Sequence, residues 1–149
     1  MIDRMDIVTT ADTWIGTRWQ HQGRSAAGID CIGLVECVGQ ALGLVTTSAL
    51  TVAPGYSRIP DGRELMAGLD AHMRRLAEID AAQPGDVLLM RFEVAPQHVA
   101  LVAPGAGGRP DIIHAWAGAR RVVRHGLDAL WRSRCVAAYT WPALVKGGA

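Results

Sequence analysis

Residues 28–39, GIDCIGLVECVG, place a cysteine directly after an aspartate and at the start of an apolar run with helical spacing. Asp30 is a residue type that caps helix N-termini, because its carboxylate accepts hydrogen bonds from free backbone N–H groups of the first turn. The apolar residues that follow Asp30 recur every three or four positions, which is typical of one buried helix face. That face comprises Cys31, Leu34, Val35, Val38 and Leu42. We therefore expect a helix from Cys31 to about Leu42, with Cys31 in its first turn on the inward side.

Cys31 has two interpretations at this position. Free cysteine is among the most often buried residue types, so a packing role in a core helix is the simpler one. A helix N-terminus, however, lowers a thiol pKa, because its free N–H groups and the helix dipole stabilise the nucleophilic thiolate. Gly33 keeps the adjoining turn small, which leaves room for a substrate. The helix alone does not choose between core residue and nucleophile.

The composition is that of one globular domain over residues 1–149. A chain of this length buries roughly 70% of its unfolded surface. The formal net charge is +1, which gives no support to a nucleic-acid partner. The three cysteines include no C-x-x-C pair, so we expect neither a disulfide framework nor a structural zinc site, and no cofactor or metal.

Two features of the sequence concern the cellular location of the protein: the absence of a long apolar stretch and the charges near residue 1. No apolar stretch has the length of a membrane span, so we expect no membrane insertion. The segment 1–14 carries charges where a signal peptide needs an apolar core. We therefore expect the chain to be made in the cytoplasm, without a signal peptide.

The first half of the chain is helical in pattern and the second half is strand-like. Two further helices are expected, a short one over residues 9–17 capped by a threonine and one over residues 63–79. Short strands follow over residues 86–92, 98–103, 111–117, 120–125 and 135–141, with a small helix over residues 126–134. Helices followed by an antiparallel sheet indicate an α+β domain.

Two histidines fall on neighbouring predicted strands. The strand period of two places His98 on one face of its strand, and it aligns His114 with Trp116 on the next. The turn-forming segment PGAGGRP, residues 104–110, joins these strands, so a hairpin sets His98 close to His114. If the sheet packs on the cysteine helix, the order becomes nucleophile, base and orienting residue. Each histidine taken alone is better explained as a satisfied, half-buried residue.

Three motifs together resemble the NlpC-type cell-wall cysteine peptidases, a papain-like family. They are GIDCIGLV (28–35), PGDVLLM with HVALV (84–90 and 98–102), and IIHAW (112–116). The segment 14–39, WIGTRWQHQGRSAAGIDCIGLVECVG, is similar to the phage-tail branch, which includes tail peptidases of phage-derived gene transfer particles. The resemblance runs from about Asp12 to Pro142. It implies a papain-like α+β fold, with the nucleophile at a helix N-terminus packed on an antiparallel sheet.

The same resemblance implies roles, a substrate and a location. Cys31 would be the nucleophile, His98 the general base and His114 the orienting residue. The substrate would be the stem peptide of peptidoglycan, often cut between D-glutamate and diaminopimelate. A hydrolase of the phage-tail branch would sit in the virion tail, contact the tail hub or other tail proteins, and act on the periplasmic cell wall.

One position departs from the family's pattern. Trp19 stands where the family usually has a tyrosine whose hydroxyl lies beside the nucleophile. An indole N–H donates one hydrogen bond but accepts none. Oxyanion stabilisation would then fall to the backbone N–H of Cys31, with Trp19, Gln20 or Gln22 as helpers, and losing one such donor costs about 10²–10³ in rate.

Other polar and aromatic residues carry weaker signals. His21 is either a cleft residue or an exposed loop histidine, and Trp116 is either a cleft wall or a core residue. His72 and His125 belong to no constellation, so we interpret both as surface residues. A larger set is assigned to structure: Asp86 as a strand start, and Trp14, Trp131 and Trp141 as packing residues.

Three alternatives remain beside the peptidase. The first keeps the fold but is a catalytically weak or inactive structural plug of the tail hub. The second is a cysteine amidase or acyltransferase with the same triad, because a fold does not determine a substrate. The third, a metal-binding module, has the least support.

Overall fold

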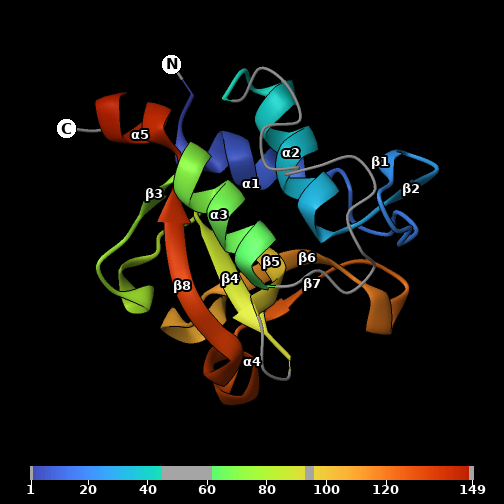
Figure 1. Cartoon of the computed structure of the whole chain (residues 1–149). Coiled ribbons are helices and arrows are strands. Elements are labelled where there is room, and N and C mark those ends of the chain that lie inside the picture. Colours follow the sequence, from blue (N-terminus) through green and yellow to red (C-terminus); the bar gives the residue numbers. More distant parts are fainter. Residues whose placement is uncertain (1, 45–61, 93–95, 148–149) are drawn as a thin grey trace.

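The computed structural model describes residues 2–44, 62–92 and 96–147. Three helices cover one face of a six-stranded antiparallel sheet, and a short fourth helix packs against the other face (Figure 1). This is the α+β arrangement that the order of helical and strand-like segments predicts. No helix in the described ranges is long and apolar enough to cross a membrane.

The first helix begins earlier than expected. Helix α1 spans Arg4–Asp12 and is capped by Asp3. Asp3 and Asp6 form a capping box, in which each carboxylate accepts the backbone N–H of the other residue, at 2.9 Å and 2.8 Å. The predicted helix over residues 9–17 with a threonine cap is therefore wrong, because this stronger start signal lies upstream of it.

The cysteine helix is confirmed. Helix α2 spans Cys31–Ala41, and Asp30 is its N-cap. Leu34, Val35 and Val38 are buried, as the apolar periodicity predicts.

Helix α3 is shorter than predicted. It spans Gly62–His72 rather than residues 63–79. The chain then forms the short edge strand β3, Arg74–Arg75, which pairs with the last strand of the sheet. A 3₁₀ turn, η1, follows at Ile79–Ala81. Pairing with the sheet edge thus replaces the last helical turns.

All five predicted strands are present. The order across the sheet is β3-β8-β4-β5-β6-β7. The main strands are β4 (Val87–Arg91), β5 (Pro96–Ala103), β6 (Asp111–Trp116), β7 (Arg121–Gly126) and β8 (Cys135–Thr140). The remaining elements are the ribbon of β1 (Arg24–Ser25) and β2 (Gly28–Ile29), the 3₁₀ turns η2 (Ala106–Gly108) and η3 (Ala117–Ala119), the predicted small helix α4 (Ala129–Arg134), and α5 (Pro142–Gly147).

The sheet separates two apolar clusters. The helix-side cluster joins α1, α2 and α3 to alternate residues of the central strands, among them Val99 and Leu101 of β5. The outer cluster joins the intervening residues, such as Ala100 and Val102, to Trp131 of α4. Alternation along each strand therefore divides its side chains between the two faces.

The hairpin of β5 and β6 forms as predicted. Leu101 pairs with Ile113 and Val102 with Ile112, in antiparallel register. Strand β7 adds to the other edge of β6, with Ile112 opposite His125. Three histidine-bearing strands therefore lie side by side.

Candidate active site

Cys31 is held at the first turn of α2 by the cap residue that precedes it. Asp30 Oδ1 accepts the backbone N–H of Gly33 at 2.8 Å, and Oδ2 accepts that of Gln22 at 2.8 Å. One buried carboxylate thus ties the helix start to the preceding loop. Gln22 adopts a left-handed backbone conformation, with φ of 60°, which turns the loop back toward the helix.

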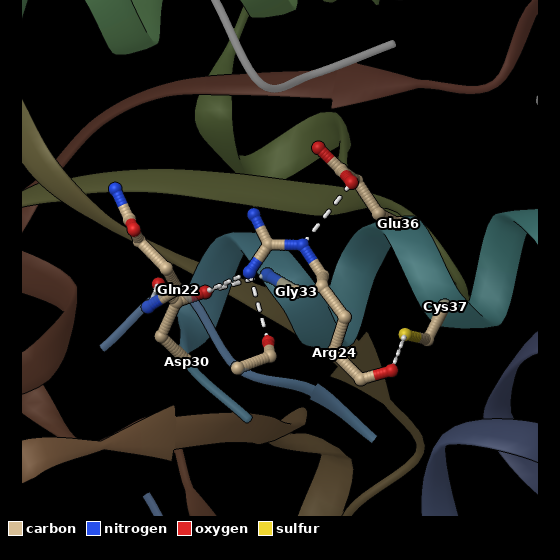
Figure 2. Close-up of polar contacts among 7 residues, drawn as sticks. Gln22, Arg24, Asp30, Gly33, Glu36 and Cys37 are labelled. Atoms are coloured by element: carbon tan, nitrogen blue, oxygen red, sulfur yellow. Dashed lines mark hydrogen bonds and ion pairs between the residues drawn. The ribbon is translucent and has the colours of Figure 1, made fainter. Parts of the chain in front are cut away.

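Arg24 connects this cap to the middle of the helix, as Figure 2 shows. Its Nη1 lies 2.9 Å from Asp30 Oδ1 and donates to the Gly23 carbonyl at 2.8 Å, while its Nε lies 3.3 Å from Glu36 Oε2. The side chains of Asp30 and Glu36 are 6% and 1% exposed. A single guanidinium therefore neutralises two carboxylates that would be costly to bury alone.

Gly33 serves this network rather than a substrate. A Cβ at this position would lie 2.7 Å from Arg24 Nη1 and would also meet the Gly23 carbonyl. The space that the missing side chain leaves is therefore filled by the loop. The expectation that Gly33 leaves room for a substrate is wrong for this reason.

Burial disfavours the thiolate form of Cys31. Cys31 is half-buried, and burial raises its pKa from 9.0 to about 12, with the negative charge of Asp30 acting in the same direction. Backbone hydrogen bonds from Val99 and Ile32 lower the pKa but do not compensate. Burial therefore outweighs the pKa-lowering effect of the helix N-terminus on the Cys31 thiol in the free protein, and the role of Cys31 as nucleophile stays a prediction.

The predicted pair of histidines is in direct contact. His98 Nε2 lies 2.7 Å from His114 Nδ1. A third imidazole continues the row, since His114 Nε2 lies 2.8 Å from His125 Nε2. His125 Nδ1 in turn lies 2.9 Å from the carbonyl oxygen of Gly126. The prediction that His125 belongs to no constellation is therefore wrong.

Aromatic side chains enclose this row. The Phe92 ring lies 5.2 Å from that of His98, Trp116 stacks on His114 at 6.0 Å, and Trp131 contacts His114 edge-to-face at 4.9 Å. Burial lowers the pKa of His98 to about 3 and that of His114 to about 2. Both imidazoles are therefore neutral at neutral pH.

Cys31 and His98 belong to different packing layers and meet at β5. Cys31 packs against the helix-side cluster, whereas the His98 ring contacts Phe92 of the outer cluster. Val99, the residue after His98, places its backbone against the Cys31 sulfur. Within the described ranges no hydrogen bond joins the Cys31 thiol to His98.

The remaining predicted cleft residues fall into two groups. Trp19 and Gln20 lie beside β2, the strand that precedes Asp30 and Cys31, since Trp19 forms a bridge with Ile29 and Gln20 donates its N–H to the Ile29 carbonyl at 3.1 Å. His21 and Gln22 continue this loop, and both are half-buried. Trp116 belongs to the other group, on His114.

A backbone contact connects the two groups. The Trp19 N–H donates to the carbonyl of Arg120 at 2.9 Å, and Arg120 follows the turn after Trp116. The roles of Trp19, Gln20, His21, Gln22 and Trp116 in substrate binding stay predictions.

Several residues assigned to structure behave as expected. Asp86 is buried, lies 2.7 Å from the Arg4 guanidinium and directly precedes β4. Trp141 is fully buried and donates its indole N–H to the Gly85 carbonyl at 2.8 Å. His72 is exposed at the end of α3. The segment Thr46–Pro60, a candidate cleft cover, lies outside the described residues.

Acid is expected to destabilise the protein through the two buried imidazoles. The pKa values of His98 and His114 lie below the ordinary 6.5, so below that pH the unfolded chain binds protons that the folded chain does not. Stability is therefore lost as the pH falls from 6.5 toward 3, by about 1.4 kcal/mol per pH unit for each histidine.

Urea unfolding at about pH 7 and about pH 5 measures this loss. His114→Gln is expected to lose less stability over this interval than the wild type. His72→Gln, which changes an exposed histidine, is expected to lose as much as the wild type. Equal losses of stability in the wild type and His114→Gln would contradict the assignment of this pH dependence to the buried histidines.

Comparison with known proteins agrees with this fold. The model of the NlpC/P60 family matches residues 16–140, which is most of the chain. The chain therefore belongs to the NlpC/P60 family. No match was found among curated proteins.

Solved structures of this family share the fold. The NlpC/p60 domain of the peptidoglycan hydrolase SagA has a TM-score of 0.67 and 19% identity, with 93% of this chain and 99% of that domain covered. An NlpC/P60 family protein from Bacillus cereus has a TM-score of 0.68 and 19% identity, with 94% of this chain covered. NlpC2 from Trichomonas vaginalis has a TM-score of 0.67 and 14% identity, with 95% covered. The chain spans 40% and 48% of the latter two proteins.

Proposed function

We propose that this protein is a cysteine peptidase that hydrolyses peptide bonds in the stem peptides of peptidoglycan. The observation that carries the proposal is the 2.7 Å contact between His98 and His114 on the strands that adjoin the Cys31 helix. In a member of the NlpC/P60 family, this arrangement matches a nucleophile, a base and a group that orients the base.

The neutral state of the site indicates how the first step proceeds. His98 takes the thiol proton on Nδ1 as Cys31 Sγ attacks the carbonyl carbon of the scissile bond. The tetrahedral intermediate then collapses, the amine leaves with that proton, and a thioester remains on Cys31. Water attacks the thioester and gives up a proton to His98, and the carboxylic acid and free thiol are released.

His98 must approach Cys31 for this transfer, because no hydrogen bond joins them in the free protein's described residues. Hydrogen bonds of catalytic groups are often long or absent without substrate and form in the complex. The oxyanion of the intermediate would be held by the backbone N–H of Cys31, with Trp19, Gln20 or Gln22 as further donors.

The cleaved bond and the setting form the finer part of the proposal. The bond is that between D-glutamate and diaminopimelate, and the enzyme is carried in a phage-like tail, where it contacts the tail hub and opens the cell wall. Support for the tail comes from the resemblance of residues 14–39 to tail peptidases. Support for the substrate class comes from the family match and from the similarity to a domain of a peptidoglycan hydrolase.

Mass spectrometry of soluble fragments tests the substrate and the bond together. Purified peptidoglycan of the diaminopimelate type is incubated with the wild-type protein and, separately, with Cys31→Ala. We expect muropeptide fragments only with the wild type, with new termini at D-glutamate and diaminopimelate. Fragments with other termini would reject this bond, and an unchanged sacculus with folded, reduced protein would reject the peptidase.

The second candidate is a structural plug of a tail hub with the same fold. Two observations favour it: burial holds the Cys31 pKa at about 12, and a tryptophan occupies position 19. A plug would leave the sacculus intact in the digestion above and would bind a tail protein equally well with Cys31 or alanine.

A further inference from the structure

The geometry of the histidine row, His98, His114 and His125, determines which ring nitrogen of each imidazole carries the proton. On β6 and β7 His125 is opposite Ile112, two residues from His114. On β5 and β6 the register continues from Leu101 and Ile113, so His98 also lies two residues from the position opposite His114. Each contact is therefore a diagonal cross-strand pair on one face of the sheet.

His125, at one end of the row, contacts a backbone carbonyl, and this contact determines where its proton lies. The carbonyl oxygen of Gly126 accepts hydrogen bonds only, so His125 carries its proton on Nδ1, 2.9 Å away. In neutral His125 the other nitrogen, Nε2, is then an acceptor. His114 must therefore donate to it from Nε2, over 2.8 Å.

The proton positions on His114 and His98 follow from that on His125. Neutral His114 with its proton on Nε2 has an unprotonated Nδ1, which accepts from His98 Nε2 over 2.7 Å. Neutral His98 with its proton on Nε2 then has an unprotonated Nδ1. That nitrogen is the one that faces away from His114, and it forms no hydrogen bond within the described ranges.

We infer that His125 is a positioning residue which, together with the Gly126 carbonyl, sets His98 in the tautomer whose Nδ1 accepts a proton. Without His125 the row permits the reverse pattern, in which His114 donates from Nδ1 to His98 Nε2 and His98 carries its proton on Nδ1. In that tautomer His98 cannot act as a base toward a thiol. The tautomer follows from the geometry alone, whereas its catalytic use rests on the proposed function.

Burial strengthens this control. His98 and His114 are 4% and 0% exposed, and aromatic rings surround them. Water therefore does not offer alternative partners along the inner part of the row. Only His125, which is half-buried, lies toward the solvent.

NMR spectroscopy of the ¹⁵N-labelled protein at neutral pH tests the inference without a substrate. Two-bond correlations between ring protons and nitrogens distinguish protonated from unprotonated imidazole nitrogens. In the wild type we expect His98 and His114 to be protonated on Nε2 and His125 on Nδ1. Protonation of His98 on Nδ1 in the wild type would overturn the inference.

Two substitutions at the same position separate the tautomer effect from packing. His125→Phe removes the acceptor, and we expect His98 and His114 to populate both tautomers. His125→Gln offers an amide oxygen to His114 Nε2, and we expect the wild-type tautomers to return. Unchanged tautomers in His125→Phe would overturn the inference, and the wild-type spectrum remains a test if this variant does not fold.

Kinetics of stem-peptide hydrolysis provides the functional readout. We expect kcat of His125→Phe to fall by about 10-fold to 100-fold with little change in KM, the range found when a hydrogen-bond partner that orients a metal-bound histidine is removed. His125→Gln is expected to recover most of this loss, and His72→Phe is expected to match the wild type. If none of the proteins hydrolyses the peptide but the tautomers behave as expected, the proposed function fails while the tautomer assignment stands.

Discussion

Peptidoglycan hydrolysis is expected to disappear when Cys31 is replaced by alanine. The thiol supplies the electron pair that forms the thioester, and no other described residue of the site replaces it. We expect the rate to fall by about 10⁴-fold or more, the scale at which a nucleophile acts in comparable triads. Release of soluble fragments, followed by mass spectrometry, measures the loss.

Matched cysteine variants and a stability measurement accompany this experiment. Cys37→Ala and Cys135→Ala change the other two free thiols, and both are expected to retain wild-type rates. The free energy of unfolding of Cys31→Ala is expected to change by about 1 kcal/mol or less, since one half-buried sulfur is lost. Wild-type turnover by Cys31→Ala would remove Cys31 as the nucleophile.

The largest expected effect on stability comes from Arg24. Its guanidinium lies 2.9 Å from Asp30 and 3.3 Å from Glu36, and Arg24→Met keeps an unbranched apolar stem but removes the charged group. Removing one partner from a buried ion-pair network costs about 3–5 kcal/mol, because the remaining charges lose their compensation. Urea unfolding near neutral pH measures this loss of stability.

Arg132→Met is the matched control for this substitution. Arg132 pairs with Asp80 at 2.9 Å, but Asp80 is 79% exposed, so water replaces the lost partner and a much smaller change is expected. Equal destabilisation by Arg24→Met and Arg132→Met would contradict the explanation that Arg24 stabilises the protein because its partners Asp30 and Glu36 are buried. Because Asp30 caps α2, Arg24→Met is also expected to slow hydrolysis.

The Cys31 helix and the histidine pair were predictable because both rest on local signals. Asp30 and the apolar periodicity after it determine where α2 begins and which face it buries. The turn-forming segment 104–110 joins two strand patterns directly, so His98 and His114 were expected to meet. The NlpC/P60 family followed from the same motifs.

The features that the sequence does not predict depend on tertiary contacts. The place of His125 depends on the register of β6 and β7, which is set by the turn at Ala117–Ala119 and by the left-handed conformation of Arg120, with φ of 63°. Arginine is not a residue type that signals this conformation. The raised pKa of the Cys31 thiol arises from burial by elements distant in the sequence, whereas the sequence alone shows only that Cys31 lies at a helix N-terminus.

Intact-protein mass spectrometry after rapid acid quenching is the most direct test of the central claim, that Cys31 attacks the stem peptide. The protein is mixed with a diaminopimelate-containing stem peptide, quenched during turnover and digested to locate any added mass. We predict an acyl group of the stem peptide on the fragment that contains Cys31, and none on Cys31→Ala. Peptide cleavage with the adduct on another residue, or with wild-type rates in Cys31→Ala, would contradict the account.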